Sequence, residues 1–306
     1  MGSIHTSCEQ SLTKESPPVI DTVGVVGLGM VGGTIARAFS EARVTVHGYD
    51  RYLNIGSPQQ LDICRVVFLC VPTPGLPDRG YDLTEIWSAA QEIEPHLQPG
   101  SVVVVKSTVS PGTNDRLAAA FPRVEFASLP EFLVEARPIE TFTNPDRIII
   151  GARSGDVATQ LRELLGKVAP EAPVLIVRPI EAELTKLCSN ALLAAKVSMA
   201  NQLSEVCDRF EVSWPRIKSV VGLDRRIGTE HLTVTEERGF GGSCLPKDLD
   251  GLIAAARSVG CAPQLLEAIA DYNCRIRSRA EAAETARNGS GPQLHDGAQS
   301  STRASV

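Results

Sequence analysis

Short apolar runs alternate with amphipathic stretches through the first half of the chain. Amphipathic helices are predicted between most of these runs, including residues 84–93 and 158–167. Strands that alternate with helices are typical of a parallel, doubly wound α/β sheet. The runs have the length and β-branched content of buried strands, and they lie at residues 23–26, in the segment that ends at Asp50, and at 66–71, 102–106, 124–127, 147–150 and 174–177.

The segment between Asp50 and Val66 is too short to hold a full crossover helix and a strand. We therefore expect one βα unit of the usual doubly wound sheet to be missing.

The pattern changes at residue 181, where one long helix is predicted to continue to about residue 210. This stretch has an acidic first turn and contains no glycine or proline. Its apolar stripe comprises Leu184, Leu187, Ala191, Ala195 and Met199. A second face carries Glu183, Lys186, Asn190, Val197 and Asn201 at spacings of three and four residues, which fits either a solvated face or a functional one.

Shorter helices are predicted around residues 214–222, 249–259 and 263–286. We expect an α/β domain at 21–178 and a helical domain at 179–286. Residues 1–20 and 287–306 lack hydrophobic periodicity and are predicted to be a disordered leader and a disordered tail.

The segment GVVGLGMVG predicts a dinucleotide site, because it follows a strand and opens a helix. Gly27 allows the tight turn, Gly29 lets the backbone approach a pyrophosphate, and Gly32 lets the helix pack on the strand. The N–H groups at the helix start, including those of Met30 and Val31, favour phosphate. Asp50 ends the second strand, where an acid receives a ribose hydroxyl pair, so we predict NAD rather than NADP. The neighbouring Arg51 would soften that preference.

Composition excludes several other classes. The 306 residues are 43% hydrophobic and 22% charged, with a net charge of −6. The chain therefore has no excess of basic residues that would indicate binding to nucleic acid or to an anionic membrane. It contains no run of apolar residues long enough to span a bilayer, and no secretion signal. The eight cysteines form no CxxC or metal-ligand spacing, so we predict reduced thiols, no metal and a cytoplasmic location.

The segment GFGGSCLPKDLD, residues 239–250, places Cys244 after bare glycine backbone and before Lys247 and Asp248. By itself such a segment is most often a turn that contains a cysteine. Seven segments together change that interpretation: GVVGLGMVG; VVFLCVPTP; VVVKSTVSPGT; LPEFLVEA with NPDRIIIG; EAELTKLCSNALLAAKVSMANQLSEVC; RIG; and GFGGSCLPKD. In this order they resemble the UDP-glucose/GDP-mannose 6-dehydrogenase family, whose members oxidise a sugar's primary alcohol to a carboxylate with NAD. The matching segments cover most of residues 22–275.

The resemblance implies a role for each matching residue. Cys244 resembles the nucleophile that forms a thiohemiacetal and then a thioester, on a loop where glycine lets the sugar carbon approach. Lys186 resembles the lysine that stabilises oxyanion character, with Asn190 holding it, and Asp248 the aspartate that acts through water as general base. Glu131 resembles the carboxylate assigned to thioester hydrolysis.

Further positions follow from the same match. Thr108 resembles a threonine near the hydrolytic water and also belongs to the cofactor side, together with Val71, Pro72 and Thr73. Lys247 and Arg226 resemble residues that contact substrate, and the equivalent arginine comes from the partner subunit. The ordinary alternative, a polar residue in a loop, stays open for Thr108 and Arg226. The match also assigns substrate contacts to Phe132, Leu133, Phe240 and Gly241.

The chain departs from the family pattern in two ways. The segment after Asp50 is shorter than the family's. After residue 286 we expect only the tail, and not the family's second Rossmann-like domain that clamps the substrate nucleotide. Three functions stay open: four-electron oxidation of a nucleotide sugar, the same chemistry on a smaller phosphorylated sugar or nucleoside phosphate, and an inactive NAD-binding remnant that regulates a full-length partner. The retention of Cys244, Lys186, Asn190, Glu131 and Asp248 argues against the remnant. By analogy with the family, we expect an NAD-binding Rossmann domain at 21–178 and a helical domain for dimerisation and catalysis at 179–286. We also expect a homodimer built on the long helix.

Overall fold

A computed structural model describes residues 20–76 and 80–288 of the chain. Its internal contacts divide the chain into two compact units, residues 1–189 and 190–306. The sequence-based boundary at 178/179 lies earlier, at the start of a helix whose first turns belong to the first unit. Nearly all of the predicted disordered leader and tail lies outside the described residues, although the last helix continues to Asn288.

The first unit is built on one seven-stranded sheet with the strand order β2-β1-β3-β4-β5-β6-β7. Strands β1 to β5 are parallel to one another, and this confirms the predicted doubly wound α/β class. The strands are β1 (Thr22–Val26), β2 (Thr45–Tyr49), β3 (Val66–Leu69), β4 (Val102–Val105), β5 (Glu125–Ser128), β6 (Ile148–Gly151) and β7 (Val174–Val177).

The sequence pattern predicts a sheet that is parallel throughout, and this is wrong at one position. Strand β6 meets β5 in the antiparallel sense, at the single pair Ser128 and Gly151. Between these strands the chain forms only one short helix, α4 (Pro138–Thr143). A parallel connection needs a crossover of a dozen or more residues that returns the chain to the other edge of the sheet, usually through a helix. Here the chain turns back from the carboxyl end of β5, so residues 129–147 stay close to that edge.

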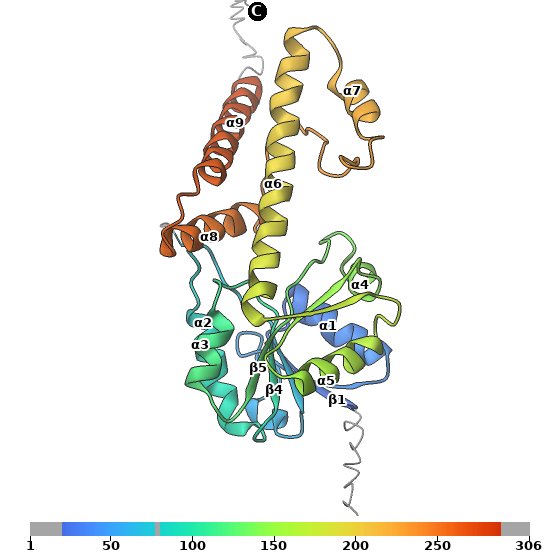
Figure 1. Ribbon diagram of the computed structural model, residues 1–306, viewed down its shortest axis with the longest axis vertical. Coiled ribbons are helices and arrows are strands. Elements are labelled where there is room, and N and C mark those ends of the chain that lie inside the picture. Colours follow the sequence, from blue (N-terminus) through green and yellow to red (C-terminus); the bar gives the residue numbers. More distant parts are fainter. Residues whose placement is uncertain (1–19, 77–79, 289–306) are drawn as a thin grey trace, which may run out of the picture. The chain divides into compact units, whose positions relative to one another are not determined.

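Helices cover both faces of the sheet (Figure 1). Alternate residues of each strand point to opposite faces, so Val66 and Phe68 pack in one core whereas Val67 and Leu69 pack in the other. The first core contains α1 (Met30–Glu41), α4 and α5 (Gly155–Gly166). The second contains α2 (Thr84–Ile93), with the short η2 (Glu94–His96) after it, and α3 (Thr113–Ala120).

A single 3₁₀ turn, η1 (Pro58–Leu61), stands where the missing βα unit would be. A capping box between Ser57 and Gln60 holds its start, and the fully buried Leu61 fills the second core. Strand β2 is therefore the edge of the sheet, which confirms the expected shortening of the fold.

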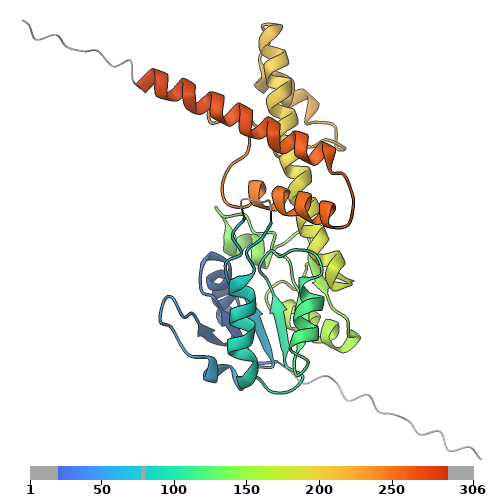
Figure 2. The same cartoon turned by 90° about the vertical axis from the view of Figure 1, so that its left-hand side faces the viewer.

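The second unit contains residues 190–209 of α6 (Pro179–Arg209) with α7 (Trp214–Val221), α8 (Leu245–Ser258) and α9 (Gln264–Asn288). One cluster joins Ala194 of α6 to Leu249 and Ile253 of α8 and Ala270 of α9, and Figure 2 shows these helices side by side. Helix α8 begins at Leu245, four residues before the predicted start, because Pro246 is compatible with the first turn of a helix. No helix in the described part of the chain is long and apolar enough to cross a bilayer.

Candidate active site and cofactor site

The glycine loop between β1 and α1 has the geometry that a dinucleotide phosphate requires. Gly27 adopts φ +83°, and a Cβ on Gly32 would stand 1.8 Å from the Gly27 carbonyl oxygen, so neither position accepts a side chain. Gly29 caps α1 with no side-chain hydrogen bond, and nothing lies within 4 Å of the place where its Cβ would be. The first N–H groups of α1, including those of Met30 and Val31, therefore begin the helix beside open space, as at phosphate sites.

Asp50 lies directly after β2, and its carboxylate is held in place by backbone. Oδ2 accepts a hydrogen bond from the N–H of Leu28 at 2.8 Å, and Oδ1 accepts from the N–H groups of Tyr52 and Leu53 at 3.0 Å each. Burial acts to raise the pKa of Asp50, but these three N–H groups outweigh it and hold the pKa below its ordinary value. The side chain is thus a fixed anion beside the glycine loop.

A cleft of about 270 Å³ opens between the glycine loop and α2. It brings together six of the residues predicted for the cofactor: Gly27, Gly29, Asp50, Arg51, Val71 and Pro72. Met30, Val31, Gly32, Thr73 and Thr108 do not line it. The Thr73 hydroxyl instead donates to the Thr108 carbonyl at 2.6 Å, and this bond ties together the segments that follow β3 and β4. Sequence reasoning missed Glu85 and Glu92, two acids of α2 that line the cleft.

A buried polar cluster lies at the carboxyl ends of the strands in the first unit. Lys186 of α6 is 7% exposed, and its Nζ stands 3.8 Å from Oε2 of Glu131 and 5.3 Å from the ring centroid of Phe132. The other Glu131 oxygen accepts from the N–H of Leu133. The same Phe132 ring also contacts Arg147, the residue directly before β6. The guanidinium carbon of Arg147 lies 4.7 Å from the ring centroid.

Lys106 is a second buried lysine beside this cluster, and it was predicted only as part of a strand. Its Nζ donates to the carbonyl of Pro130 at 3.0 Å. Burial lowers the pKa of Lys106 to about 8, with Glu131 and Cys70 acting in the opposite direction and Lys186 adding to the decrease. The lysine therefore carries the electrostatic cost of a cation removed from water.

The second unit contains the cysteine loop and its support. Cys244 is exposed and caps the N-terminus of α8, and the Ser243 hydroxyl lies 3.6 Å from its sulfur. Asp248, one turn into α8, is 1% exposed. Its Oδ2 accepts from the Asn190 side-chain amide at 2.6 Å, and its Oδ1 accepts from Lys247 Nζ at 2.8 Å. Every oxygen of this buried carboxylate thus has a polar partner.

Two asparagines hold the glycine segment that leads to Cys244. Asn273 of α9 accepts from the N–H of Phe240 at 2.7 Å and donates to the Phe240 carbonyl at 2.9 Å, while Asn201 of α6 accepts from the N–H of Gly239 at 3.2 Å. A Cβ on Gly241 would stand 2.7 Å from the Arg277 guanidinium. No sequence motif predicts a role for Asn273 or Arg277, since isolated polar residues on a helix match no motif.

The polar face predicted on the long helix is buried. Five residues of that face are less than 10% exposed: Glu183, Lys186, Asn190, Val197 and Asn201. The interpretation as a solvated face is therefore wrong. Of the predicted apolar stripe, Leu187 and Ala191 are buried, whereas Met199 is 59% exposed.

Arg226 differs from the other predicted residues. Its side chain is 88% exposed and forms an ion pair with Asp224, with NH2 2.6 Å from Oδ2. No group of three or more His, Cys, Asp or Glu side chains suited to a metal ion occurs in the described part of the chain.

Comparison with known proteins gives consistent matches over both units. The NAD binding domain of the UDP-glucose/GDP-mannose dehydrogenase family matches residues 53–168, and the central domain of that family matches residues 180–275. The chain is 37% identical over 224 residues to the UDP-glucose 6-dehydrogenase AglM of Haloferax volcanii, which covers 67% of this chain and 51% of that protein. It is 35% identical over 221 residues to the UDP-glucose 6-dehydrogenase of Pseudomonas aeruginosa, covering 69% of this chain and 48% of that protein.

The chain thus spans about half the length of the curated relatives that it matches. Among solved structures, a UDP-glucose dehydrogenase from Pyrobaculum islandicum is similar with a TM-score of 0.77 and 31% identity, over 88% of this chain and 72% of that one. The matched segments, the glycine loop and the sheet topology agree with one another. The chain therefore belongs to the UDP-glucose/GDP-mannose dehydrogenase family and contains its NAD binding domain and its central domain.

Proposed function

We propose that this chain oxidises the primary alcohol of a nucleotide sugar to a carboxylate, with NAD as the hydride acceptor. The observation that carries the proposal is an exposed thiol, Cys244, at the start of a helix whose first turn holds the buried, fully hydrogen-bonded Asp248. The similarity to proteins named UDP-glucose 6-dehydrogenase supports the substrate class.

NAD, when bound, would accept one hydride in each of two oxidation steps. The residues present fit this cofactor, because side chains are excluded at Gly27 and Gly32 where the backbone must approach phosphate. The first N–H groups of α1 would face the pyrophosphate, and Asp50 would receive the ribose hydroxyls. Val71 and Pro72 would line the apolar side of the cleft.

The Cys244 sulfur would act on the aldehyde that the first oxidation leaves. The sulfur adds to the carbonyl carbon, the π-electron pair moves to oxygen, and oxygen takes a proton to complete a thiohemiacetal. Loss of a hydride from that carbon and of the hydroxyl proton gives a thioester. Water then adds to the thioester, the carbon–sulfur bond breaks, and the thiol and the carboxylate are released. Four electrons leave the substrate in total, and one water is consumed.

Lys186 and Glu131 would act in the reaction steps in which charge develops on the substrate oxygen or on the attacking water. A buried ammonium group stabilises negative charge on the substrate oxygen more strongly than an exposed one, because the surroundings screen it less. Glu131 has one oxygen bound to the Leu133 N–H and the other near Lys186, which supports a role in activating the hydrolytic water. Thr108 would lie near that water.

Asp248, Asn190 and Lys247 would hold and assist the cysteine loop. The Asn190 amide fixes one Asp248 oxygen and Lys247 reaches the other, which supports the assignment of Asp248 as a base that acts through water. Lys247 also offers an ammonium group for a substrate phosphate. Phe132, Leu133, Phe240 and Gly241 complete the proposed substrate contacts.

We also propose a homodimer formed through α6, with Arg226 contributing to the partner's site. Large apolar side chains are exposed along one face of the helix at Leu192, Met199, Leu203 and Val206, and Phe210 directly after the helix is exposed as well. All seven cysteines in the described residues are free thiols, and this supports a cytoplasmic location as part of the same proposal.

The test counts NADH per molecule of product with purified full chain and a panel of UDP-sugars, hexose phosphates and nucleoside monophosphates. We expect two NADH per UDP-sugar oxidised. Cys244→Ala should allow at most one, because no thiol traps the aldehyde, and Cys244→Ser should slow turnover severely because its oxygen ester hydrolyses poorly. Cys261→Ala removes another exposed thiol and should change nothing. Two NADH per substrate from Cys244→Ala would contradict the nucleophile assignment.

A further inference from the structure

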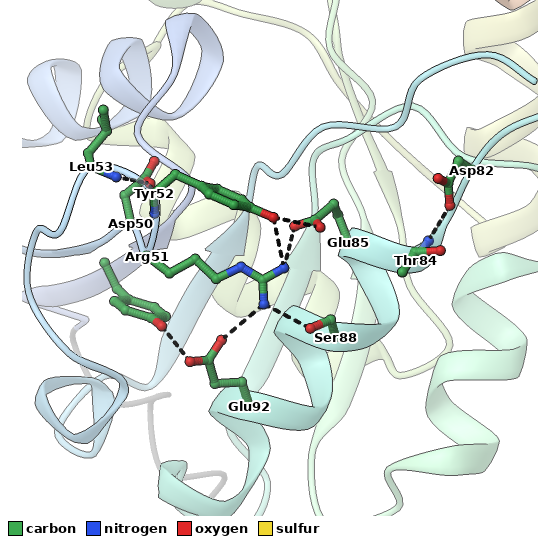
Figure 3. Close-up of polar contacts among 10 residues, drawn as sticks. Asp50, Arg51, Tyr52, Leu53, Asp82, Thr84, Glu85, Ser88 and Glu92 are labelled. Carbon is green, nitrogen blue, oxygen red and sulfur yellow. Dashed lines mark hydrogen bonds and ion pairs between the residues drawn. The ribbon is translucent and has the colours of Figure 1, made fainter.

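Arg51 follows the ribose-binding acid directly, yet two carboxylates hold its guanidinium on the wall of the cofactor cleft (Figure 3). Its NH2 atom lies 2.6 Å from Glu85 Oε2, and its NH1 atom lies 3.8 Å from Glu92 Oε2. NH1 also donates to the Ser88 hydroxyl at 2.8 Å, and NH2 donates to the Tyr52 hydroxyl at 3.2 Å. The guanidinium therefore has partners on both of its terminal nitrogens.

The three partners on α2 form one face of that helix. Glu85, Ser88 and Glu92 follow each other at spacings of three and four residues, so their side chains point the same way, toward the end of β2. Two tyrosines fix the carboxylates in turn. The Tyr52 hydroxyl donates to Glu85 Oε1 at 2.8 Å, and the Tyr49 hydroxyl donates to Glu92 Oε1 at 2.5 Å. Figure 3 shows Glu85, Ser88 and Glu92 converging on Arg51.

Tyr49 is a permanent donor to the Glu92 carboxylate. Burial, and then the hydrogen bond to Glu92, raises the pKa of Tyr49 to about 12, so its hydroxyl keeps its proton at physiological pH. The Arg51 side chain is one-third exposed and its charge centre also lies 5.0 Å from the Tyr52 ring centroid. Moving the guanidinium toward a ligand would break the ion pairs with Glu85 and Glu92. It would also break both hydrogen bonds and this ring contact.

Electrostatics at this end of the cleft oppose a second phosphate. Asp50, Glu85 and Glu92 supply three negative charges, and Arg51 supplies one positive charge. A 2′-phosphate on the adenine ribose adds a charge of about −2 at neutral pH. An arginine near the ribose-binding acid is the group that usually accommodates this phosphate. Here the same guanidinium is already neutralised by two acids.

We propose that Glu85 and Glu92 are specificity-determining residues, which hold Arg51 away from the adenine ribose and thereby exclude the 2′-phosphate of NADP. This inference rests on the proposed function only in that NAD binds in this cleft. The acid after β2 selects for hydroxyl groups, and the α2 carboxylates remove the one adjacent cation that would counteract it.

The test measures binding of 5′-AMP and 2′,5′-ADP to the full chain by titration calorimetry, which needs no turnover. The variants are Glu85→Gln, Glu92→Gln, the double variant, and the double variant with Arg51→Ala. The amides keep the size and acceptor oxygens that Tyr49 and Tyr52 use, so the cleft should keep its shape. Glu94→Gln is the matched control, because it removes a nearby carboxylate that pairs with Arg123 instead.

We expect wild-type protein and Glu94→Gln to bind 5′-AMP more tightly than 2′,5′-ADP. The double variant should shift the affinity ratio toward 2′,5′-ADP by about tenfold or more, the factor that a new charge-assisted hydrogen bond supplies. Adding Arg51→Ala should abolish that shift. The single variant Glu85→Gln should shift the ratio in the same direction, and it serves if the double variant does not fold.

Two results would overturn the inference: an unchanged ratio in the folded double variant, or a shift that survives Arg51→Ala, since the second would mean that lost negative charge alone is responsible. Failure of the proposed function looks different. In that case nucleotide binding and its ratio respond as described, while no alcohol in the substrate panel is oxidised.

Discussion

At the scale of single residues, burial distinguishes the polar side chains that we propose for the active site from those on the solvated surface. Lys186, Asn190 and Asp248 are each less than 10% exposed, and each has a polar or aromatic partner. Burying such groups costs free energy unless they are paired, so a chain that merely had to fold would place apolar residues there. Lys106 belongs to the same class, although no motif identified it as functional.

Burial of Lys106 makes the free energy of unfolding increase with pH in the range where its pKa differs between the folded and unfolded chain. Its pKa is about 8 in the fold and 10.5 ordinarily, so between these values the unfolded chain binds a proton that the folded chain does not. Stability should therefore rise with pH from 8 to 10.5, and the full cost, roughly 3 kcal/mol, applies below pH 8. Lys106→Met removes this cost but leaves the Pro130 carbonyl without its donor, which offsets about 1 kcal/mol.

Urea unfolding of wild type and Lys106→Met at pH 7 and pH 10 checks this expectation. The variant should be more stable by about 2 kcal/mol at pH 7, with the difference shrinking toward zero at pH 10. Lys167→Met, at a lysine that water partly reaches, is the control and should show no such gain at pH 7. A Lys106→Met advantage that is equal at both pH values would contradict the burial argument.

At the scale of elements, the site depends on where strands end and helices begin. The glycine loop joins β1 to α1, Asp50 follows β2, and Cys244 caps α8. These junctions expose backbone N–H groups and tolerate the close approach of a ligand, whereas the middle of a strand or helix does neither. The proposed cofactor contacts and the proposed nucleophile therefore lie at the ends of regular elements, whereas Lys186 and Asn190 lie within α6.

Gly32→Ala tests the junction of β1 and α1. The added Cβ would overlap the Gly27 carbonyl oxygen, so α1 must move away from β1. We expect a loss of about 1–3 kcal/mol in unfolding free energy, typical of overpacking, and weak binding of NAD in fluorescence titration. Gly33→Ala is the matched control, because its Cβ would meet only the Leu28 carbonyl oxygen at 3.5 Å. Equal behaviour of the two variants would count against the close-packing role of Gly32.

At the scale of the whole molecule, the exposed apolar row on α6 is the feature that a monomer explains least well. Isolated exposed apolar residues are ordinary, but a continuous row along one face of a helix usually marks an interface. The proposed dimer would bury this row and would also give Arg226, now paired with Asp224, a position in the partner's site.

Met199→Lys should therefore shift the chain from dimer to monomer in light scattering at micromolar concentration, because it places a charge in the apolar row. Asp208→Lys introduces the same side chain on the opposite face of α6 and should leave the oligomeric state unchanged. Activity per chain should fall with Met199→Lys if Arg226 acts across the interface. A wild-type chain that is monomeric at this concentration would contradict both the dimer and that role.

The local sequence pattern determined most of the secondary structure and part of the cofactor site. Strand and helix positions follow from periodicity, and the glycine loop with Asp50 follows from spacing, because each depends on residues that are close together in the sequence. The tertiary structure decided the rest. It set the reversal of β6, the burial of the polar face of α6 and the capture of Arg51 by Glu85 and Glu92, which lie 34 or more residues further along the chain. Those outcomes depend on packing and electrostatic contacts between segments far apart in sequence, and no local pattern of residues encodes them.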